Sequence, residues 1–350
     1  MKKFSIVFLC LIIILSCIPF SGICTLAKEY TNEDFKYEIL KDGNIMITEY
    51  IGTDKEIVSI PSRIDGKRVT ILSNGIFGLV SNYNINIINV PATVNTIEDL
   101  VFYRTHHLKE VNVDSKNLTY YSDNGVLINK KKQAVICYPR EKEEGKYYVP
   151  NGVKTIGRYS FSYSLVENVY LPDSVTNIRY GAFYCSHITN LRISRNLKKI
   201  DNIAFAQLNT TKLFIPKSVS TIERLAFGYG ASSNYTIYGY NNSYVQKYCK
   251  MKSINFVAVD PAVPKKTTVK GAKGKIKVNY KKVKKAKGFQ VKAVSGKKKT
   301  VKIFKTKKSA KKSLKGMKKG TYKVKVRAFN TYNGEKIYGP WAKAKTVTVK

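Results

Sequence analysis

Apolar residues return along the middle of this chain every 22 positions, in columns that keep one register. The columns are Phe161, Phe183, Phe205 and Phe227; Ile156, Ile178, Ile200 and Ile222; Val153, Val175, Leu197 and Val219; and the pairs Val169/Leu171, Leu191/Ile193, Leu213/Ile215 and Tyr235/Ile237. A fixed period in the twenties is typical of a solenoid, because one copy cannot bury its apolar face alone and has to stack on its neighbours. We therefore predict a rod of parallel strands, with the phenylalanine column as the spine of its core.

The region before the repeats alternates between apolar and polar residues with a period of two. Phe35 and Tyr37 belong to this pattern, which continues on the far side of the Asp-Gly turn at 42–43. Alternation around Asp-Gly predicts a β-hairpin within an N-terminal β cap over 28–59. Such a cap would cover the backbone groups that the first strands of a stack leave unpaired.

Solenoid repeats are expected over 60–258, and the period breaks once, near 114–148, where the pattern predicts an inserted β-hairpin. Asn242 or Ser243 can act as an N-cap. After it, three apolar residues share one helical face: Val245, Tyr248 and Cys249. This spacing predicts a short amphipathic helix that closes the solenoid, followed by one last strand.

A second domain is expected over 267–350, after a linker at 259–266 that contains Pro261 and Pro264. The predicted strands are Lys275–Tyr280, Phe289–Val294, Val301–Phe304, Tyr322–Phe329 and Thr346–Val349. Regular short strands between turn residues favour an Ig-like β-sandwich. The fold class is therefore mainly β: a parallel-β solenoid with a short closing helix, followed by a sandwich.

The repeats carry short motifs at fixed places. The motifs are Ile60-Pro61 with Asp65-Gly66, Val149-Pro150 with Ile156-Gly157, and Leu171-Pro172 with Gly181-Ala182-Phe183. They resemble the BspA-like class of leucine-rich repeats found on bacterial surfaces, over about residues 30–258. The resemblance implies an adhesin for host or matrix proteins, and it brings no ligand residues with it.

The second domain has a resemblance of its own. The segment from Leu314 to Tyr322 is similar to the corner that enters strand F of a fibronectin type III domain, with Tyr322 as the corner tyrosine. The segment at 339–341, Gly-Pro-Trp, also fits the approach to the last strand of that family. Tyr280 is a departure, because it stands where the family usually has tryptophan.

The N-terminus predicts export. Lys2 and Lys3 precede an apolar run of 12 residues over 4–15, and small residues end at Ala27. This arrangement is typical of a signal peptide over 1–27 that is cleaved after Ala27. The alternative is a lipoprotein whose Cys17 is lipidated. We expect a secreted or cell-surface protein of a Gram-positive bacterium.

Three cysteines remain after cleavage: Cys137, Cys185 and Cys249. Their odd number and wide spacing argue against a disulfide framework. We expect Cys185 to be a buried thiol, because it lies beside Phe183 of the core column.

Charge divides the chain. From residue 261 to the end there are 31 Lys and Arg residues and one acidic residue, so 30 of the 39 net positive charges lie there. Such a field attracts polyanions, and we expect an anionic cell-wall polymer or glycan as partner. The candidate polyanion-binding residues are Lys281, Lys282, Lys284, Lys285, Lys297, Lys298 and Lys299. The bias toward Lys, with few aromatics, argues against specific nucleic-acid recognition. The alternative is a charge that serves solubility alone.

The sequence predicts no catalysis. It contains no GxSxG, HExxH or Gly-rich phosphate loop. His106, His107 and His187 lie on loops without acidic or cysteine residues in the same column, so we expect neither a metal nor a cofactor. The protein is expected to be a monomeric binding protein and not an enzyme.

Outward positions of the repeat strands offer a candidate ligand-binding face. These positions are Asn89, Asn112, Tyr170, Arg192, Phe214 and Thr236. Tyr170, Arg192 and Phe214 stand on successive turns, so we expect them to align about 5 Å apart. Residues of these types are enriched at binding hot spots, which favours an extracellular or host protein as ligand. The alternatives are scattered surface residues on a structural wall-associated module, and a non-catalytic carbohydrate-binding accessory.

Overall fold

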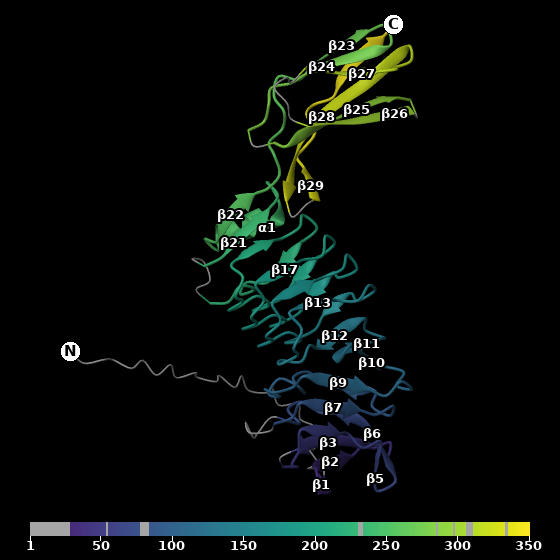
Figure 1. The fold of residues 1–350 in the computed structure, drawn as a ribbon, viewed down its shortest axis with the longest axis vertical. Helices are drawn as coiled ribbons and strands as arrows, with labels where there is room; N and C mark the ends of the chain where they lie inside the picture. Colours follow the sequence, from purple (N-terminus) through teal and green to yellow (C-terminus); the bar gives the residue numbers. More distant parts are fainter. Residues whose placement is uncertain are drawn as a thin grey trace, which may run out of the picture.

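The computed structural model describes residues 29–53, 55–77, 84–229, 234–284, 286–296, 298–305, 311–332 and 335–350. The predicted signal peptide and Cys17 lie outside these residues. In Figure 1 the stack runs from β1 at one end of an elongated molecule to β22, and antiparallel sheets follow at the C-terminal end. None of the helices in the described part of the chain has the length and apolar character that a membrane crossing needs.

The solenoid begins with an antiparallel three-stranded unit, β1 (Glu29–Thr31), β2 (Phe35–Ile39) and β3 (Ile45–Tyr50). Its tight turn is fixed by the Asp42 carboxylate, which accepts the N–H of Asn44 at 3.0 Å. Gly43 takes φ 79°, a conformation that glycine adopts without steric cost. β3 then pairs in parallel with β6 (Lys67–Leu72), so the unit continues directly into the stack.

Two ladders of parallel strands build about nine turns over residues 45–258. The first ladder consists of β4 (Ile57–Ser59), β7 (Ile87–Val90) and β9 (Glu110–Val113); then β13 (Lys146–Tyr148), β15 (Asn168–Tyr170) and β17 (Asn190–Arg192); and then β19 (Lys212–Phe214), β21 (Thr236–Gly239) and β22 (Asn255–Ala258). The second ladder consists of β6 and β8 (Thr96–Ile97), then β12 (Ala134–Cys137), β14 (Thr155–Ile156), β16 (Asn177–Ile178), β18 (Lys199–Ile200) and β20 (Thr221–Ile222). A short β5 (Arg63–Ile64) folds back antiparallel onto β6. The predicted solenoid is confirmed.

The phenylalanine column forms the spine of the core. Phe183 lies 5.2 Å from Phe161 and 5.8 Å from Phe205, measured between ring centroids. The last ring of the column, Phe227, is 5.5 Å from Phe205. All four rings are at most 3% exposed, so the prediction that they are core and not a ligand ladder holds in the structure.

The inserted hairpin lies inside the stack. It consists of β10 (Tyr120–Asp123) and β11 (Val126–Asn129), and β12 joins it to the second ladder by pairing in parallel with β14. All of β11 is buried: Leu127 packs into the N-terminal half of the core, whereas Val126 and Ile128 pack into the C-terminal half. The hairpin therefore bridges two hydrophobic cores.

The solenoid ends as the sequence predicts, with helix α1 (Tyr244–Met251). The Ser243 hydroxyl caps the helix by accepting the N–H of Gln246 at 3.2 Å. The buried face consists of Val245, Tyr248 and Cys249.

The C-terminal region forms two antiparallel sheets. One contains β23 (Thr268–Ala272), β24 (Lys275–Asn279) and β27 (Lys311–Lys315). The other contains β26 (Lys298–Lys305), β25 (Gly288–Ser295), β28 (Gly320–Tyr332) and β29 (Glu335–Tyr338) in that order, and β30 (Lys345–Val349) also pairs with β28. Buried residues of both sheets share one core, which includes Ile276, Tyr280, Phe289 and Val326. β23, β27 and β29 have no counterpart among the predicted strands.

The three described cysteines differ in burial, and one of them is not buried as predicted. Cys137, Cys185 and Cys249 are free, and Cys137 and Cys249 are buried. Cys185 is only half-buried, so the prediction of a buried thiol at this position is wrong. The physical reason is its place on an outward turn, where it takes φ 53° and its thiol donates to the side-chain oxygen of Gln207.

Candidate binding surfaces

The outward face of the first ladder presents a row of large side chains. Tyr148, Tyr170 and Arg192 are in register on β13, β15 and β17. The rings of Tyr148 and Tyr170 stack with centroids 4.5 Å apart and planes 12° apart. Tyr148 is 61% exposed and Arg192 is also exposed, while Tyr170 is half-buried between them. We name this row, Tyr148, Tyr170 and Arg192, the sheet-face row.

Sequence reasoning missed Tyr148. It lies 22 residues before Tyr170, so the period itself contains the signal. Tyr148 is the last residue of the segment 114–148, in which the period is broken, so the regular turns counted from Pro150 do not include it.

An asparagine ladder borders the sheet-face row and fixes its edge. The Asn190 amide donates to the side-chain oxygen of Asn168 at 3.3 Å and approaches the Tyr170 hydroxyl at 3.5 Å. Asn168 in turn donates to the carbonyl of Gly145 at 2.9 Å. These bonds give the aromatic pair a polar rim of amide groups.

Phe214, the third predicted residue of this face, has different surroundings. Its strand β19 belongs to the next sheet with β21 and β22, and its side chain is half-buried. The ring of Tyr332 from β28 lies 5.0 Å away, and that of Tyr240 lies 6.1 Å away. The structure thus brings Tyr170 and Arg192 together but places Phe214 in a contact with the C-terminal domain.

The predicted equivalence of Thr236 is also corrected. In the observed register Phe214 pairs with Tyr238, and Lys212 pairs with Thr236. The step from β19 to β21 is therefore 24 residues, because the loop before β21 is longer, and counting by 22 falls two residues short. For the same reason Ile237, and not Tyr235, is the partner of Leu213.

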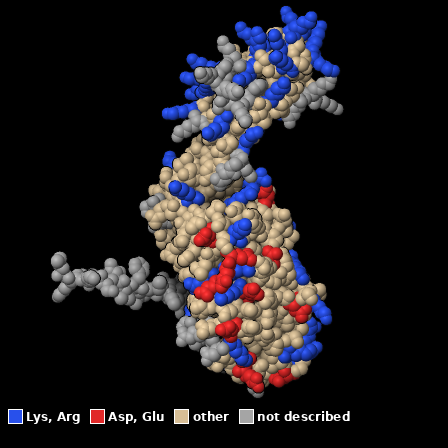
Figure 2. All heavy atoms as spheres, viewed as in Figure 1, with Lys and Arg blue, Asp and Glu red and all other residues tan. Residues whose placement is uncertain are grey.

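We name the exposed Lys and Arg side chains of the C-terminal domain the lysine surface. Figure 2 shows Lys and Arg crowding that domain, whereas Asp and Glu on the same face lie over the solenoid. Lys281, Lys282 and Lys284 are exposed on the segment between β24 and β25. Of the other predicted lysines, Lys285 and Lys297 lie outside the described residues, and Lys298 and Lys299 are placed at the start of β26.

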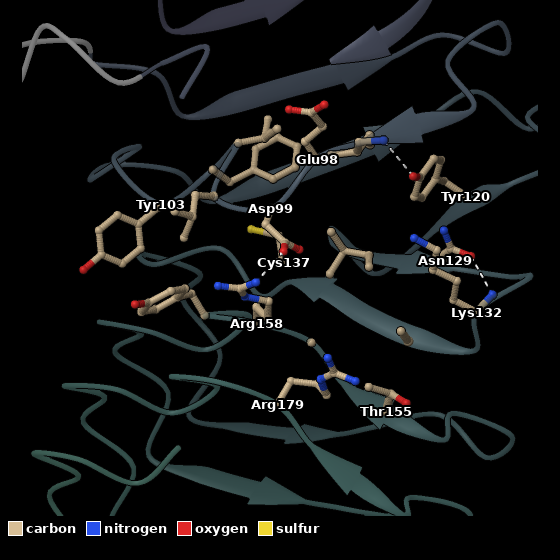
Figure 3. Close-up of a pocket in the computed structure, with 18 residues that line it drawn as sticks. Glu98, Asp99, Tyr103, Tyr120, Asn129, Lys132, Cys137, Thr155, Arg158 and Arg179 are labelled. Carbon is tan, nitrogen blue, oxygen red and sulfur yellow. Dashed lines mark hydrogen bonds and ion pairs between the residues drawn. The ribbon is translucent and has the colours of Figure 1, made fainter. Parts of the chain in front are cut away.

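A cavity of about 420 Å³ opens beside the inserted hairpin (Figure 3). Its charged lining residues are largely paired: Arg158 contacts Asp99 at 3.1 Å, and Arg179 contacts Asp201 at 3.1 Å. The Arg158–Asp99 pair joins the turn after β8 to the turn after β14, so it ties the two halves of the solenoid together.

The histidines do not converge. His107 faces Glu141 at 3.2 Å, His187 is exposed, and His106 lies against Arg140. Burial and the neighbouring Arg140 charge lower the pKa of His106. In the described ranges, no group of three or more His, Cys, Asp or Glu side chains could hold a metal ion.

These features define a leucine-rich-repeat solenoid. The family described as "BspA type Leucine rich repeat region" matches residues 56–128 and 145–257 in six copies, and the chain belongs to this family. No curated protein matches the chain.

Several solved structures are similar to this chain. A leucine-rich cell surface protein of Faecalibacterium prausnitzii is 16% identical, with 66% of this chain and 94% of that chain covered and a TM-score of 0.35. The pneumococcal vaccine antigen PcpA is 14% identical, with 66% and 98% covered and a TM-score of 0.41. A leucine-rich repeat protein of Bacteroides ovatus is 17% identical, with 66% and 68% covered and a TM-score of 0.36.

Proposed function

We propose that this protein is an exported, non-catalytic binding protein of the bacterial cell surface. Its solenoid recognises an extracellular or host protein, and its lysine-rich domain is attracted to anionic cell-wall polymer or glycan. Membership in the BspA-type family supports recognition of a protein by the solenoid, because the resemblance to that family implies an adhesin. The predicted signal peptide over 1–27 supports export. An exported chain whose described cysteines, Cys137, Cys185 and Cys249, are all free favours a Gram-positive source.

The sheet-face row carries the proposal for a protein ligand. Tyr148 and Tyr170 form a rigid stacked pair, and Arg192 extends the row on the next turn. Aromatic and arginine side chains are enriched among the residues that dominate binding energy at protein interfaces, and tyrosine loses little conformational entropy for the area it buries. The amide rim of Asn168 and Asn190 adds the polar border that such interfaces have.

The test replaces Tyr148, Tyr170 and Arg192 together with serine and measures binding to immobilised extracellular-matrix proteins. We expect the affinity to fall at least about tenfold with the melting temperature unchanged. The matched control is Leu118→Ser, which removes a side chain that is 82% exposed elsewhere. Equal affinity of the triple variant and the control would reject the sheet-face row as the ligand site.

For the C-terminal domain we propose a fibronectin type III-like sandwich that retains the protein at the anionic wall. Its strand order supports this assignment, as does the Tyr322 hydroxyl, which donates to the carbonyl of Lys318 at 3.0 Å. Tyr280 takes the place of the usual tryptophan and packs 4.3 Å from Phe289. The lysines contribute a diffuse positive field and not specific nucleic-acid recognition.

A second candidate is a monomeric wall-associated module without a specific protein ligand. The observation that favours it is the concentration of charge, 30 of 39 net charges, in the C-terminal 90 residues. Under this alternative the protein binds purified wall polymer, matrix proteins do not compete, and the triple variant binds as well as the parent. Fractionation of producing cells with and without a high-salt wash measures the wall attachment directly.

A further inference from the structure

Five tyrosines gather on another flank of the solenoid, on the turns that lead from the second ladder to the first. Tyr103 lies between β8 and β9, Tyr159 and Tyr163 lie between β14 and β15, and Tyr180 and Tyr184 lie between β16 and β17. We name them the tyrosine cluster. Each ring meets its neighbours edge to face, with centroids 4.9 to 6.5 Å apart. The cluster therefore forms one continuous aromatic surface across several turns.

A cavity of about 730 Å³ opens against this surface. Four members of the cluster line it, Tyr103, Tyr159, Tyr180 and Tyr184. The other described lining residues include amide and hydroxyl groups of Asn202, Gln207 and Thr211, and none of the described lining residues carries a charge. A volume of this size suits a ligand and not a single water. This neutral lining contrasts with the net charge of +39 of the whole protein.

The backbone is shaped to hold one of these rings. A Cβ at Gly181 would lie 2.5 Å from Cε1 of Tyr159, so the glycine of the next turn leaves the space in which this ring lies. Tyr159 itself takes φ 54°, and Tyr163 takes φ 58°. Left-handed backbone costs a residue other than glycine roughly 1 kcal/mol. The same left-handed conformation recurs 22 and 44 residues later, at Gly181 and Ile203 and at Cys185 and Gln207, so it belongs to the repeat, and Tyr159 and Tyr163 place rings on these turns.

The polar groups around the rings can both donate and accept hydrogen bonds. Burial raises the pKa of Tyr163 and of Tyr184 to about 12, so both hydroxyls stay protonated at physiological pH. The side-chain oxygen of Asn202 accepts the N–H of Leu225 at 2.8 Å, which fixes the position of this amide. Amides and hydroxyls of this kind match the hydroxyl groups of a sugar, which also act in both roles.

We propose that the tyrosine cluster and its cavity form a binding site for a neutral oligosaccharide. Sugar rings present C–H groups that pack on aromatic rings, and hydroxyls that can bond to the side-chain amides of Asn202 and Gln207. A polyanion is disfavoured because none of the described residues that line the cavity is charged. Arg140 and Arg158 lie over the rings of Tyr163 and Tyr180 but do not line the cavity. The site does not include the sheet-face row, so its test can fail while the protein ligand proposed above is still supported, and the reverse.

The test measures binding of the full chain to four neutral hexasaccharides: cellohexaose, chitohexaose, maltohexaose and mannohexaose. We expect at least one to bind at micromolar to millimolar concentration, with an affinity that is the same in low and high salt, because no charge takes part. Failure of all four to bind overturns the proposal. Binding that disappears in high salt also overturns it, because the sugar would then be held by the lysine surface.

Two variants locate the site. Tyr159→Gly removes a ring at a position where glycine suits the backbone, and Gly181→Ala displaces the same ring while keeping it in the chain. Both should weaken sugar binding about tenfold or more. Melting curves of both variants verify that the solenoid is still folded, because Gly181 takes φ 61° and alanine strains the backbone there. The control Tyr148→Ser changes the sheet-face row and should leave sugar binding unchanged; loss of binding in this control would place the sugar on the other face and reject the proposal.

Decaproline serves as the competing probe, because a polyproline helix also packs on tyrosine rings. Decaproline binding that is lost in Tyr159→Gly, without binding of any of the sugars, would identify a peptide site and reject the oligosaccharide. Sugar binding with no response to decaproline supports the proposal.

Discussion

The ring of Tyr332 lies 5.0 Å from the ring of Phe214, although 118 positions separate them in the sequence. Tyr332 also lies 5.3 Å from Tyr238, so one side chain of the C-terminal domain bridges two turns of the solenoid. In Figure 1 the β28–β29 hairpin reaches toward the last turns of the stack. This contact places the lysine-rich domain against β19 and β21, at the C-terminal end of the first ladder.

We predict that Tyr332→Ser releases the C-terminal domain from the solenoid. The aromatic contact with Phe214 and Tyr238 is then lost, while the linker at 259–266 still joins the domains, so the domains should move more independently. Small-angle scattering should show a broader distribution of distances, and proteolysis of the linker should become faster. Thr331→Ser, an exposed neighbour on the same strand, is the control and should change neither. Identical scattering of the two variants would show that Tyr332 does not hold the domains together.

We predict that Phe183→Ala destabilises the solenoid by about 3–5 kcal/mol. Phe183 is fully buried and stacked on both sides, so truncation leaves a cavity that neighbouring turns cannot fill without moving. Denaturant unfolding followed by circular dichroism measures the loss. Phe183→Leu retains most of the volume and should cost clearly less; a similar cost for both variants would contradict the packing argument.

Much of the solenoid could be predicted from the sequence, because stacking forces equivalent residues into the same place on every turn. The Phe183 column and the Ser243-capped helix follow from this rule and from local capping chemistry. The period also places Tyr170 beside Arg192. Each of these relationships depends on residues that lie one turn or less apart in the sequence.

The rest depends on contacts that no local pattern encodes. Tyr332 covers Phe214 because two domains meet, and neither domain's periodicity contains that information. The 22-residue period does not predict the tyrosine cluster either. Tyr103 contacts Tyr159 only because the inserted hairpin brings their turns together. The longer loop before β21 shifts the register by two residues, which a constant step of 22 does not predict.

We predict that replacing Lys281, Lys282 and Lys284 with serine flattens the salt dependence of binding to purified wall polymer. Each lysine that contacts a linear polyanion releases counterions, and on nucleic acids this contributes roughly 0.7–0.9 to the slope of log K against log salt. The three residues are exposed on one segment and should act together. Titration at several salt concentrations gives the slope. An unchanged slope would place the polymer elsewhere on the domain.

We predict that both domains lose stability above pH 10. Burial raises the pKa of Tyr248 in the closing helix and of Tyr280 in the sandwich core to about 12, against 10.0 for an unperturbed tyrosine. The folded state then holds its protons more tightly than the unfolded state, so the stabilisation is complete below pH 10 and is lost as the pH rises toward 12. Circular dichroism followed together with tyrosinate absorbance measures the effect. Tyr280→Phe should shift alkaline unfolding of the sandwich upward; no shift would mean that other groups control it.

We predict that Asn117→Ala is among the most damaging polar substitutions in the solenoid. The Asn117 amide donates to the carbonyls of Pro91 and Val94 at 2.9 and 2.8 Å. Its oxygen accepts the N–H groups of Thr119 and Tyr120 at 2.9 and 2.8 Å. The side chain is 1% exposed, so alanine leaves two carbonyls and two N–H groups without these partners.

Each unsatisfied buried group costs roughly 1–3 kcal/mol, and partial rearrangement should limit the total loss for Asn117→Ala to about 4 kcal/mol. Because the segment leads into the inserted hairpin that bridges both cores, hydrogen exchange should accelerate in β10 and β11 before it does in β18. The control is Asp114→Ala, three residues earlier at an exposed position of the same turn. It removes only the solvent-facing bond from the N–H of Lys116 and should cost less than about 1 kcal/mol. Equal losses in the two variants would show that the buried amide network does not hold the hairpin in place.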